Sequence, residues 1–171
     1  MKKYEFTGET KEIRLLFRTA TLHRIRATVA FGIVEVGDLG GWIEKEENLS
    51  HEGKAWVWGN AEVCGDAEVC GDAEVWGNAK VCGDAEVFSA SHVLVIGAIG
   101  SRNDFTTFYR DKDNEITVKC GCFLGKIDRF LEKVTQTHGD SKYALVYRAA
   151  VEVAKLQIDL SGEAPKDADE E

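Results

Sequence analysis

The chain has 171 residues, of which 44% are hydrophobic and 30% are charged, a composition typical of globular proteins rather than of disordered or fibrous ones. Its net charge of -9 argues against broad binding to nucleic acid or to an anionic membrane, and we expect neither partner. Five cysteines, an odd number, fit a reducing compartment better than a secreted disulfide framework, so the sequence predicts a cytoplasmic protein.

The N-terminal segment, residues 1–48, mixes short β-like runs at residues 3–6 and 22–29 with turn-forming glycines. The repeats that follow it would leave an apolar end open, and such an end must be covered. We therefore interpret residues 1–48 as an N-terminal β cap. Its candidate inward-facing residues are Ile33, Leu39 and Ile43.

Residues 49–96 are built from a six-residue repeat. Six consecutive units of the form Ala-x-Val-x-x-x begin at Ala55, five of them close with Gly-Asp or Gly-Asn, and a degenerate unit flanks them on each side. Alanine and valine two residues apart share one face of a strand. Glycine at every sixth residue excludes a helix and supplies a corner together with Asp or Asn. Because such short units cannot bury an apolar face alone, they must stack on one another.

These repeats resemble the hexapeptide-repeat proteins that fold as a left-handed parallel β-helix, in which three six-residue sides form an 18-residue coil. The resemblance implies a mainly β fold, with a short left-handed parallel β-helix of about three coils at residues 49–96. The chain is also similar to phage and prophage hexapeptide-repeat proteins, whose functions are mostly not known. That similarity lies in RIRAT and VGDLGGWIEKEENLSHEG, between Arg24 and Gly53, and in the later CGCF and THGD segments.

An 18-residue coil places residues i and i+18 on neighbouring strands, about 4.8 Å apart. Outward-facing residues then form columns. We interpret Trp58, Trp76 and Leu94 as one apolar stripe that forms a homo-oligomer interface, and the resemblance favours a trimer. Cys64 and Cys82 form a second column, which we expect to hold free thiols because stacked parallel side chains point the same way and the compartment is reducing.

The charged residues of the repeats follow the same columns. Glu62 is predicted to stack against Lys80, so that the one lysine among the glutamates relieves a like-charge column. Glu68 over Glu86 has no such relief.

Residues 97–158 are predicted to form a small C-terminal α+β (ββαα) module. Two strands are joined by a hairpin turn at residues 111–114. Two helices follow, the first ending near Gly139 and the second beginning around Ser141. Residues 159–171 contain six acidic residues and one lysine, and we interpret them as a disordered acidic tail.

The joint between the repeats and this module is the candidate ligand-binding site. Its basic residues could hold the phosphate of a nucleotide, and its aromatic residues could stack on a base, although solvated surface is the alternative interpretation. The candidate ligand-binding residues are Arg102, Phe108, Tyr109, Arg110 and Lys119. The sequence contains no metal-ligand pattern, phosphate loop or nucleophile–base pair, so we predict no metal, no cofactor and no catalytic residue.

Three functions are compatible with these features. The first is a non-enzymatic, phage-type oligomeric binding protein that sequesters a small nucleotide-derived host immune signal, which the resemblance to phage proteins favours. The second is a structural, scaffold or virion-associated protein, because stacked repeats with an apolar stripe need no ligand. The third is a hexapeptide acyltransferase, for which His51 and His92 are the histidines within the repeats; no projecting loop or partner carboxylate is predicted for either.

Overall fold

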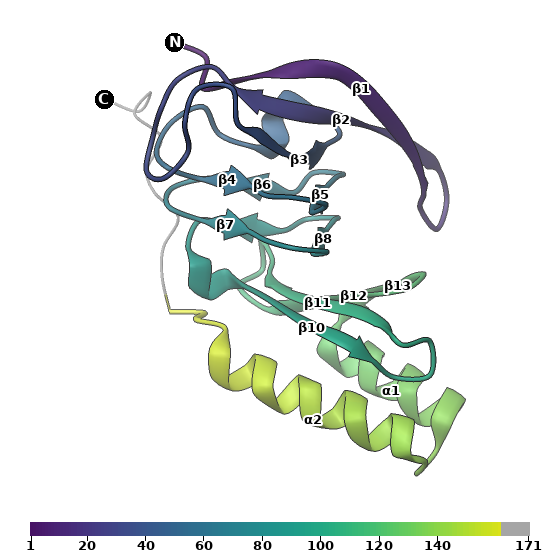
Figure 1. The fold of residues 1–171 in the computed structure, drawn as a ribbon. Coiled ribbons are helices and arrows are strands. Elements are labelled where there is room, and N and C mark those ends of the chain that lie inside the picture. The colour runs from purple at the N-terminus through teal and green to yellow at the C-terminus, as the bar shows by residue number, and fades with distance from the viewer. Residues whose placement is uncertain (162–171) are drawn as a thin grey trace.

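The computed structural model describes residues 1–161 and arranges them in layers. A long hairpin lies above a set of short stacked strands, a four-stranded sheet lies below those strands, and two helices cover the far face of that sheet (Figure 1). One apolar core fills the inside of the stacked strands, and a second lies between the sheet and the helices.

The first layer is a hairpin of two long strands. β1 (Tyr4–Arg14) and β2 (Thr19–Ala27) pair antiparallel, with a register shift between Phe6 and Thr10. We call this hairpin the arm. β3 (Leu39–Ile43) pairs antiparallel with β2 and then in parallel with the first level of the stacked strands. The arm is therefore joined to the repeats through one continuous sheet.

The prediction of which N-terminal residues face inward is correct only for Ile43, which is fully buried. Ile33 is 70% exposed and Leu39 is 48% exposed. Ile33 lies in a turn, and the residue of that turn that covers the core is Phe31, whose ring meets that of Trp56 with centroids 5.3 Å apart.

Six two-residue strands follow, and we call them the stack. They are β4 (Trp56–Val57), β5 (Glu62–Val63), β6 (Glu68–Val69), β7 (Glu74–Val75), β8 (Lys80–Val81) and β9 (Glu86–Val87). β4 pairs in parallel with β7, β5 with β8 and β6 with β9, so the predicted contact spacing of 18 residues is confirmed. The alanines and valines of the repeats are buried, and the corner glycines have φ between 55° and 70°, a conformation that side chains disfavour.

The predicted left-handed parallel β-helix is wrong. The strands form four separate sheets: a five-stranded sheet in the order β1-β2-β3-β5-β8, a four-stranded antiparallel sheet, and the two-stranded pairs β4–β7 and β6–β9. Parallel pairing involves β3, the two-residue strands and an isolated bridge from Leu49 to Val69, while the longer strands on either side pair antiparallel. Each glycine corner ends a strand after two residues, and six regular units give each strand only one partner within the stack. A continuous solenoid therefore does not form.

The second large sheet consists of β10 (Val93–Ile99), β11 (Asp104–Arg110), β12 (Ile116–Cys120) and β13 (Phe123–Lys126), in that order. The predicted hairpin turn at residues 111–114 is confirmed, because β11 and β12 pair on either side of it. The prediction missed β10 and β13, and the boundary that it placed at residue 97 falls inside β10.

The two faces of this sheet serve different cores because side chains alternate along a strand. Val93, Val95 and Tyr109 point towards the stack and close its lower end. Phe108 and Val118 point the other way, into the core between the sheet and the helices. The sheet therefore covers the lower end of the stack with one face and packs against the helices with the other.

Two helices complete the described chain. α1 (Ile127–His138) ends at Gly139, and α2 (Lys142–Gln157) follows Ser141, so both predicted helices are confirmed. Neither helix in the described part of the chain is long and apolar enough to cross a membrane. Of the predicted acidic tail, residues 162–171 lie outside the described residues.

The turn between β11 and β12 ties the lower sheet to the stack. Asp111 is buried and accepts hydrogen bonds from two backbone amides of its own turn and from the side chains of Thr117 and Lys126. Although burial alone would raise the pKa of the Asp111 carboxyl, these donors hold it below its ordinary value. The neighbouring Lys112 donates its amide to the Asp84 carbonyl at 2.9 Å, and its ammonium lies 3.2 Å from the Asp84 carboxylate.

Candidate functional site

Two of the predicted ligand-binding residues, Phe108 and Tyr109, are fully buried. Phe108 lies between the sheet and the helices, where its ring meets that of Phe130 edge to face. Tyr109 points into the stack, and its hydroxyl donates a 2.7 Å hydrogen bond to the Cys82 carbonyl. Neither ring reaches solvent, so neither is available to stack on a base in this structure.

The three predicted basic residues do not converge on one point. Arg110 is buried at the end of β11, with its guanidinium 4.5 Å from the centre of the Phe88 ring. Lys119 is also buried, and its ammonium donates a 2.6 Å hydrogen bond to the Gly121 carbonyl. Arg102 is exposed in the turn between β10 and β11. Arg102 and Lys119 nevertheless both lie at Gly121, where the Arg102 guanidinium is the group that an added Cβ would meet first, whereas Arg110 lies apart at the Phe88 ring.

The joint does contain a cleft, but different residues line it. This junction cleft has a volume of about 350 Å³ and lies between the arm, one side of the stack and the start of β11. A larger hollow of about 450 Å³ follows α1, but it is lined by that helix alone, so no groups from different elements converge there. The residues that line the junction cleft are Lys11, Asn60, Glu62, Asn78, Lys80, Asp104 and Phe105.

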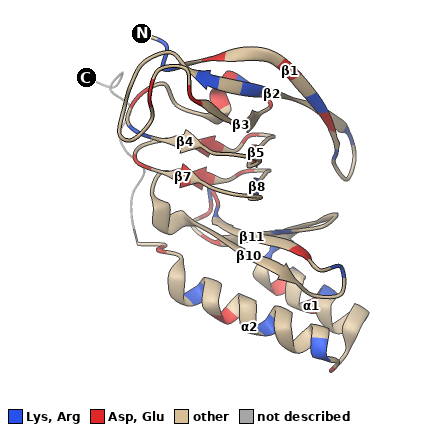
Figure 2. Cartoon of the chain, in the orientation of Figure 1, with Lys and Arg blue, Asp and Glu red and all other residues tan. Residues whose placement is uncertain are grey.

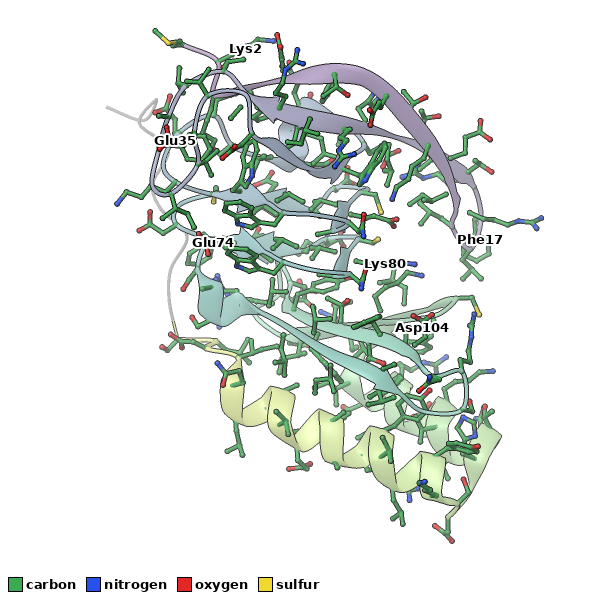
Figure 3. The ribbon with its side chains drawn as sticks, in the orientation of Figure 1. Lys2, Phe17, Glu35, Glu74, Lys80 and Asp104 are labelled. Carbon is green, nitrogen blue, oxygen red and sulfur yellow. The ribbon has the colours of Figure 1, made fainter. Side chains whose placement is uncertain are left out.

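The cleft lies on the side of the molecule towards which the arm extends. Figure 3 shows Lys80 and Asp104 on that side, with Phe17 at the tip of the arm, whereas Glu74 lies on the opposite side of the stack. Basic residues recur on β2 and α2, and acidic residues recur through the stack (Figure 2). A cation on the wall of the stack is therefore unusual in its surroundings.

Lys80 is that cation. It lies beside Glu62 in the parallel pair β5–β8, as the spacing predicted. The carboxylate of Glu62, however, pairs with Lys11 from the arm, with Nζ and Oε1 2.7 Å apart. The backbone amide of Lys80 donates to Thr107 Oγ1 at 3.0 Å, which fixes its position. Among the described residues, no hydrogen bond or ion pair engages the Lys80 ammonium. Lys11, rather than Lys80, therefore neutralises Glu62.

Two asparagines border the cleft at one corner of the stack. Asn60 and Asn78 are 18 residues apart and occupy equivalent corners, whereas the other corners carry Asp66, Asp72 and Asp84. No hydrogen bond engages either asparagine side chain among the described residues. An amide can donate to an anion without like-charge repulsion. Neither asparagine is among the predicted ligand-binding residues, although Asn in place of Asp at every third corner of the repeats is a signal visible in the sequence.

Phe105 forms the aromatic part of the cleft wall. Its side chain is partly exposed at the start of β11. The ring lies against Gly97 of β10, where an added Cβ would approach the ring Cδ1 to 2.5 Å, so only glycine permits this approach. Asp104 precedes it and its Oδ1 accepts the Phe105 amide at 2.7 Å. The cleft therefore offers a cation, amides, an aromatic surface and a carboxylate.

The predicted interface stripe is reduced to its two tryptophans. The rings of Trp58 and Trp76 stack with centroids 4.5 Å apart and planes 6° from parallel. Trp76 is 48% exposed, and its Nε1 donates to Glu74 Oε2 at 3.0 Å. Leu94 does not extend the stripe, because it lies in β10 and packs against the core between the sheet and the helices. Self-association through the tryptophans stays a prediction.

The two histidines of the repeats are engaged in the fold. His51 Nδ1 accepts the backbone amide of Lys3 at 3.0 Å, and His92 Nδ1 accepts that of Phe88 at 3.3 Å. A neutral imidazole that accepts at Nδ1 carries its proton on Nε2, so Nε2 is then a donor rather than a base. Burial lowers the pKa of both imidazoles. Within residues 1–161 no three His, Cys, Asp or Glu side chains form a metal-binding group.

No protein-family model matches the chain, and no curated protein matches it. The resemblance to hexapeptide-repeat and phage proteins therefore rests on the chain's own residues.

Proposed function

We propose that the protein is a non-enzymatic, phage-type oligomeric binding protein that sequesters a small nucleotide-derived signal of the host immune response, and that the junction cleft holds this ligand. The observation that carries the proposal is the Lys80 ammonium, which no residue among 1–161 pairs, together with two asparagine amides and the exposed Phe105 ring in the same cleft. The resemblance to phage proteins supplies the biological setting. This function places the protein in the cytoplasm of the host cell.

The chemistry of the cleft supports a phosphate-bearing nucleotide. A phosphate leaving water needs charge-assisted donors, which the Lys80 ammonium and the Asn60 and Asn78 amides supply. The Phe105 ring offers a surface on which a base can stack. The Asp104 carboxylate can accept hydrogen bonds from ribose hydroxyls. A volume of about 350 Å³ is within the usual range for small-ligand sites.

Calorimetry against cyclic dinucleotides and ADP-ribose-type nucleotides tests the proposal. We expect one class to bind, and we expect Lys80→Gln to weaken that binding about tenfold or more, the loss of one charge-assisted contact. Lys54→Gln is the matched control, since Lys54 is an exposed lysine of the same repeats outside the cleft. Ligand released by heating should be chemically intact, because sequestration leaves the molecule unchanged.

Two results would contradict the proposal. If no nucleotide of either class binds to the wild-type protein, the cleft is not a nucleotide site. If Lys54→Gln weakens binding as much as Lys80→Gln does, attraction is a general property of the surface rather than of the cleft.

The stacked Trp58–Trp76 pair, of which Trp76 is half exposed, favours a second candidate function, a structural or scaffold protein that assembles through this face and needs no ligand. Native mass measurements before and after incubation with a nucleotide extract of host cells separate the two functions. A ligand-bound oligomer supports sequestration, and an oligomer whose mass does not change supports the scaffold. The engaged Nδ1 atoms of His51 and His92 speak against acyl transfer.

A further inference from the structure

Two cysteines of the stack lie directly against each other. Cys64 follows β5 and Cys82 follows β8, and their Sγ atoms are 2.7 Å apart. Both are free thiols, and both are buried, with exposed fractions of 0% and 2%. They occupy equivalent positions on adjacent parallel strands, 18 residues apart, where the Cα separation of about 4.8 Å is within the range that a disulfide spans.

The other three cysteines have no such arrangement, and the structure describes all five. Cys70 has Phe88 at the equivalent position 18 residues later. Cys120 ends β12 and Cys122 lies in the turn before β13, and Cys120 Sγ accepts a hydrogen bond from Thr106 Oγ1. The Cys64–Cys82 pair is therefore the one place where two cysteines share neighbouring levels of the stack.

The arm covers this pair. Leu22 of β2 is fully buried against both thiols, and Ile13 and Leu15 from the other side of the hairpin pack on the same cluster. Access to the thiols from solvent therefore depends on local opening of the arm, which is one sheet layer thick.

The surroundings of the pair prepare one sulfur as a nucleophile. The hydrogen bond from the Cys64 thiol lowers the pKa of Cys82, and the nearby ammonium of Lys119 acts in the same direction. Sharing its proton with Cys82 raises the pKa of Cys64. The Tyr109 hydroxyl bonds both the amide and the carbonyl of Cys82, so the backbone of the nucleophile is held in place. A thiolate beside a resolving thiol is the arrangement of reversibly oxidised cysteines.

We propose that Cys64 and Cys82 are a reversible oxidation site, and that a hydroperoxide such as hydrogen peroxide converts them into a disulfide across two levels of the stack. The Cys82 thiolate attacks one peroxide oxygen, the O–O bond breaks, and the departing hydroxide is protonated to water. Cys64 then attacks the resulting sulfenic sulfur, the S–S bond forms, and the hydroxyl leaves as a second water. Two thiols are oxidised and one hydrogen peroxide is reduced to two waters. This inference does not depend on the proposed nucleotide binding.

The test uses the full chain with Cys70, Cys120 and Cys122 replaced by serine, alongside the wild type. After treatment with hydrogen peroxide, both remaining thiols should be lost together, and the mass should fall by about 2 Da, the loss of two hydrogens. Peptide mapping without reduction should recover a link between residues 64 and 82. The melting temperature should rise by about 5 °C, because the link closes an 18-residue loop, and dithiothreitol should reverse every change.

The matched control carries Cys64→Ser in the same background, and its melting temperature should not rise on oxidation. Three results would overturn the proposal. Both thiols of the pair could persist while the exposed Cys122 of the wild-type chain is consumed. The mass could instead rise by about 32 Da, which marks sulfinic acid. The link could form with a lower melting temperature, which would mean that the stack does not accommodate the bond.

Discussion

Two outward-facing columns of the stack occupy the same position of the repeat, but one is buried and the other is partly exposed. Trp58 and Trp76 stack on one side, and Trp76 remains half exposed to solvent. Cys64 and Cys82 stack in the same way on another side, and the arm buries them beneath Leu22. The repeat therefore determines which residues lie against each other. The segment outside the repeat determines which column is covered.

Side-chain size accompanies this difference. The two small thiols form one buried cluster with Leu22 of the arm, at the place where β3 pairs with β5 in the same sheet. The two indole rings stack on each other, with Trp58 also packed against the core of the stack and Trp76 half exposed. The cysteine column is thus buried between the stack and the arm, and the tryptophan column is partly exposed to solvent.

The largest expected effect concerns the inside of the stack, on which both columns depend. Val75 is fully buried, and Val75→Asp should unfold the protein or cost about 4 kcal/mol or more, because the charge has neither water nor a partner there. Glu68→Lys is the matched change on the outside, where it faces Glu86, and should alter stability by less than about 0.5 kcal/mol. Chemical denaturation measures both; equal tolerance would disprove the alternating orientation.

Removing the cover of the cysteine column should have the next largest effect. Leu22→Ala should cost about 3 kcal/mol and should speed the reaction of Cys64 and Cys82 with a thiol reagent under native conditions. Leu16→Ala, at the 66% exposed tip of the same arm, is the control and should change neither quantity. Unchanged thiol reactivity in Leu22→Ala would mean that the arm is not what shields the pair.

Lys3, which directly precedes the arm, should make the stability of the protein depend on pH. Lys3 is buried, and burial lowers its pKa to about 8 in the folded protein, against 10.5 for the unfolded chain. Between pH 8 and 10 the unfolded chain binds more protons at this lysine, so folding becomes more favourable as the pH rises. Relative to Lys3→Met, the wild type should gain about 1 to 2 kcal/mol over this interval, after allowance for partial solvation. A difference that stays constant with pH would contradict the lowered pKa.

Substitution of the tryptophan column, which the arm does not cover, should change the free energy of unfolding least and the oligomeric state most. The double variant Trp58→Lys/Trp76→Lys should remain folded by circular dichroism and sediment as a smaller species, because it places charge on an apolar face. Leu156→Lys, a 90% exposed position on α2, is the control for a charge placed on another apolar surface. If the double variant sediments like the wild type, the tryptophans are not an assembly interface.

The parts of the fold that depend on local pattern could be predicted from the sequence. Units of constant length force residues 18 apart to lie together, and apolar spacing followed by Gly139 is sufficient to predict α1. The β-helix prediction failed because pairing beyond the stack depends on distant segments. The long strands β1, β2 and β10 to β13 gain more hydrogen bonds by pairing antiparallel than by continuing two-residue levels.

The candidate site, like the fold, could be predicted from the sequence only in part. The sequence predicts a site at the joint, but the position of each residue along β11 decides which side chains are accessible. Phe105 and Tyr109 lie on the same face of that strand, yet Phe105 lines the cleft and Tyr109 lies beneath the centre of the stack. Lys80 was visible as an exception among glutamates. That Lys11 rather than Lys80 neutralises Glu62 depends on where the arm lies, which no local pattern contains.

The turn at Asp111 has a mechanical consequence. Its buried carboxylate gathers donors from the lower sheet, and the adjoining Lys112 clamps the same turn to Asp84 in the stack. Loosening either side removes partners from the other, so a load applied to the helices is transmitted through this turn into the repeats. We therefore expect the stack and the α+β module to unfold together in a single transition, although two separate apolar cores stabilise them.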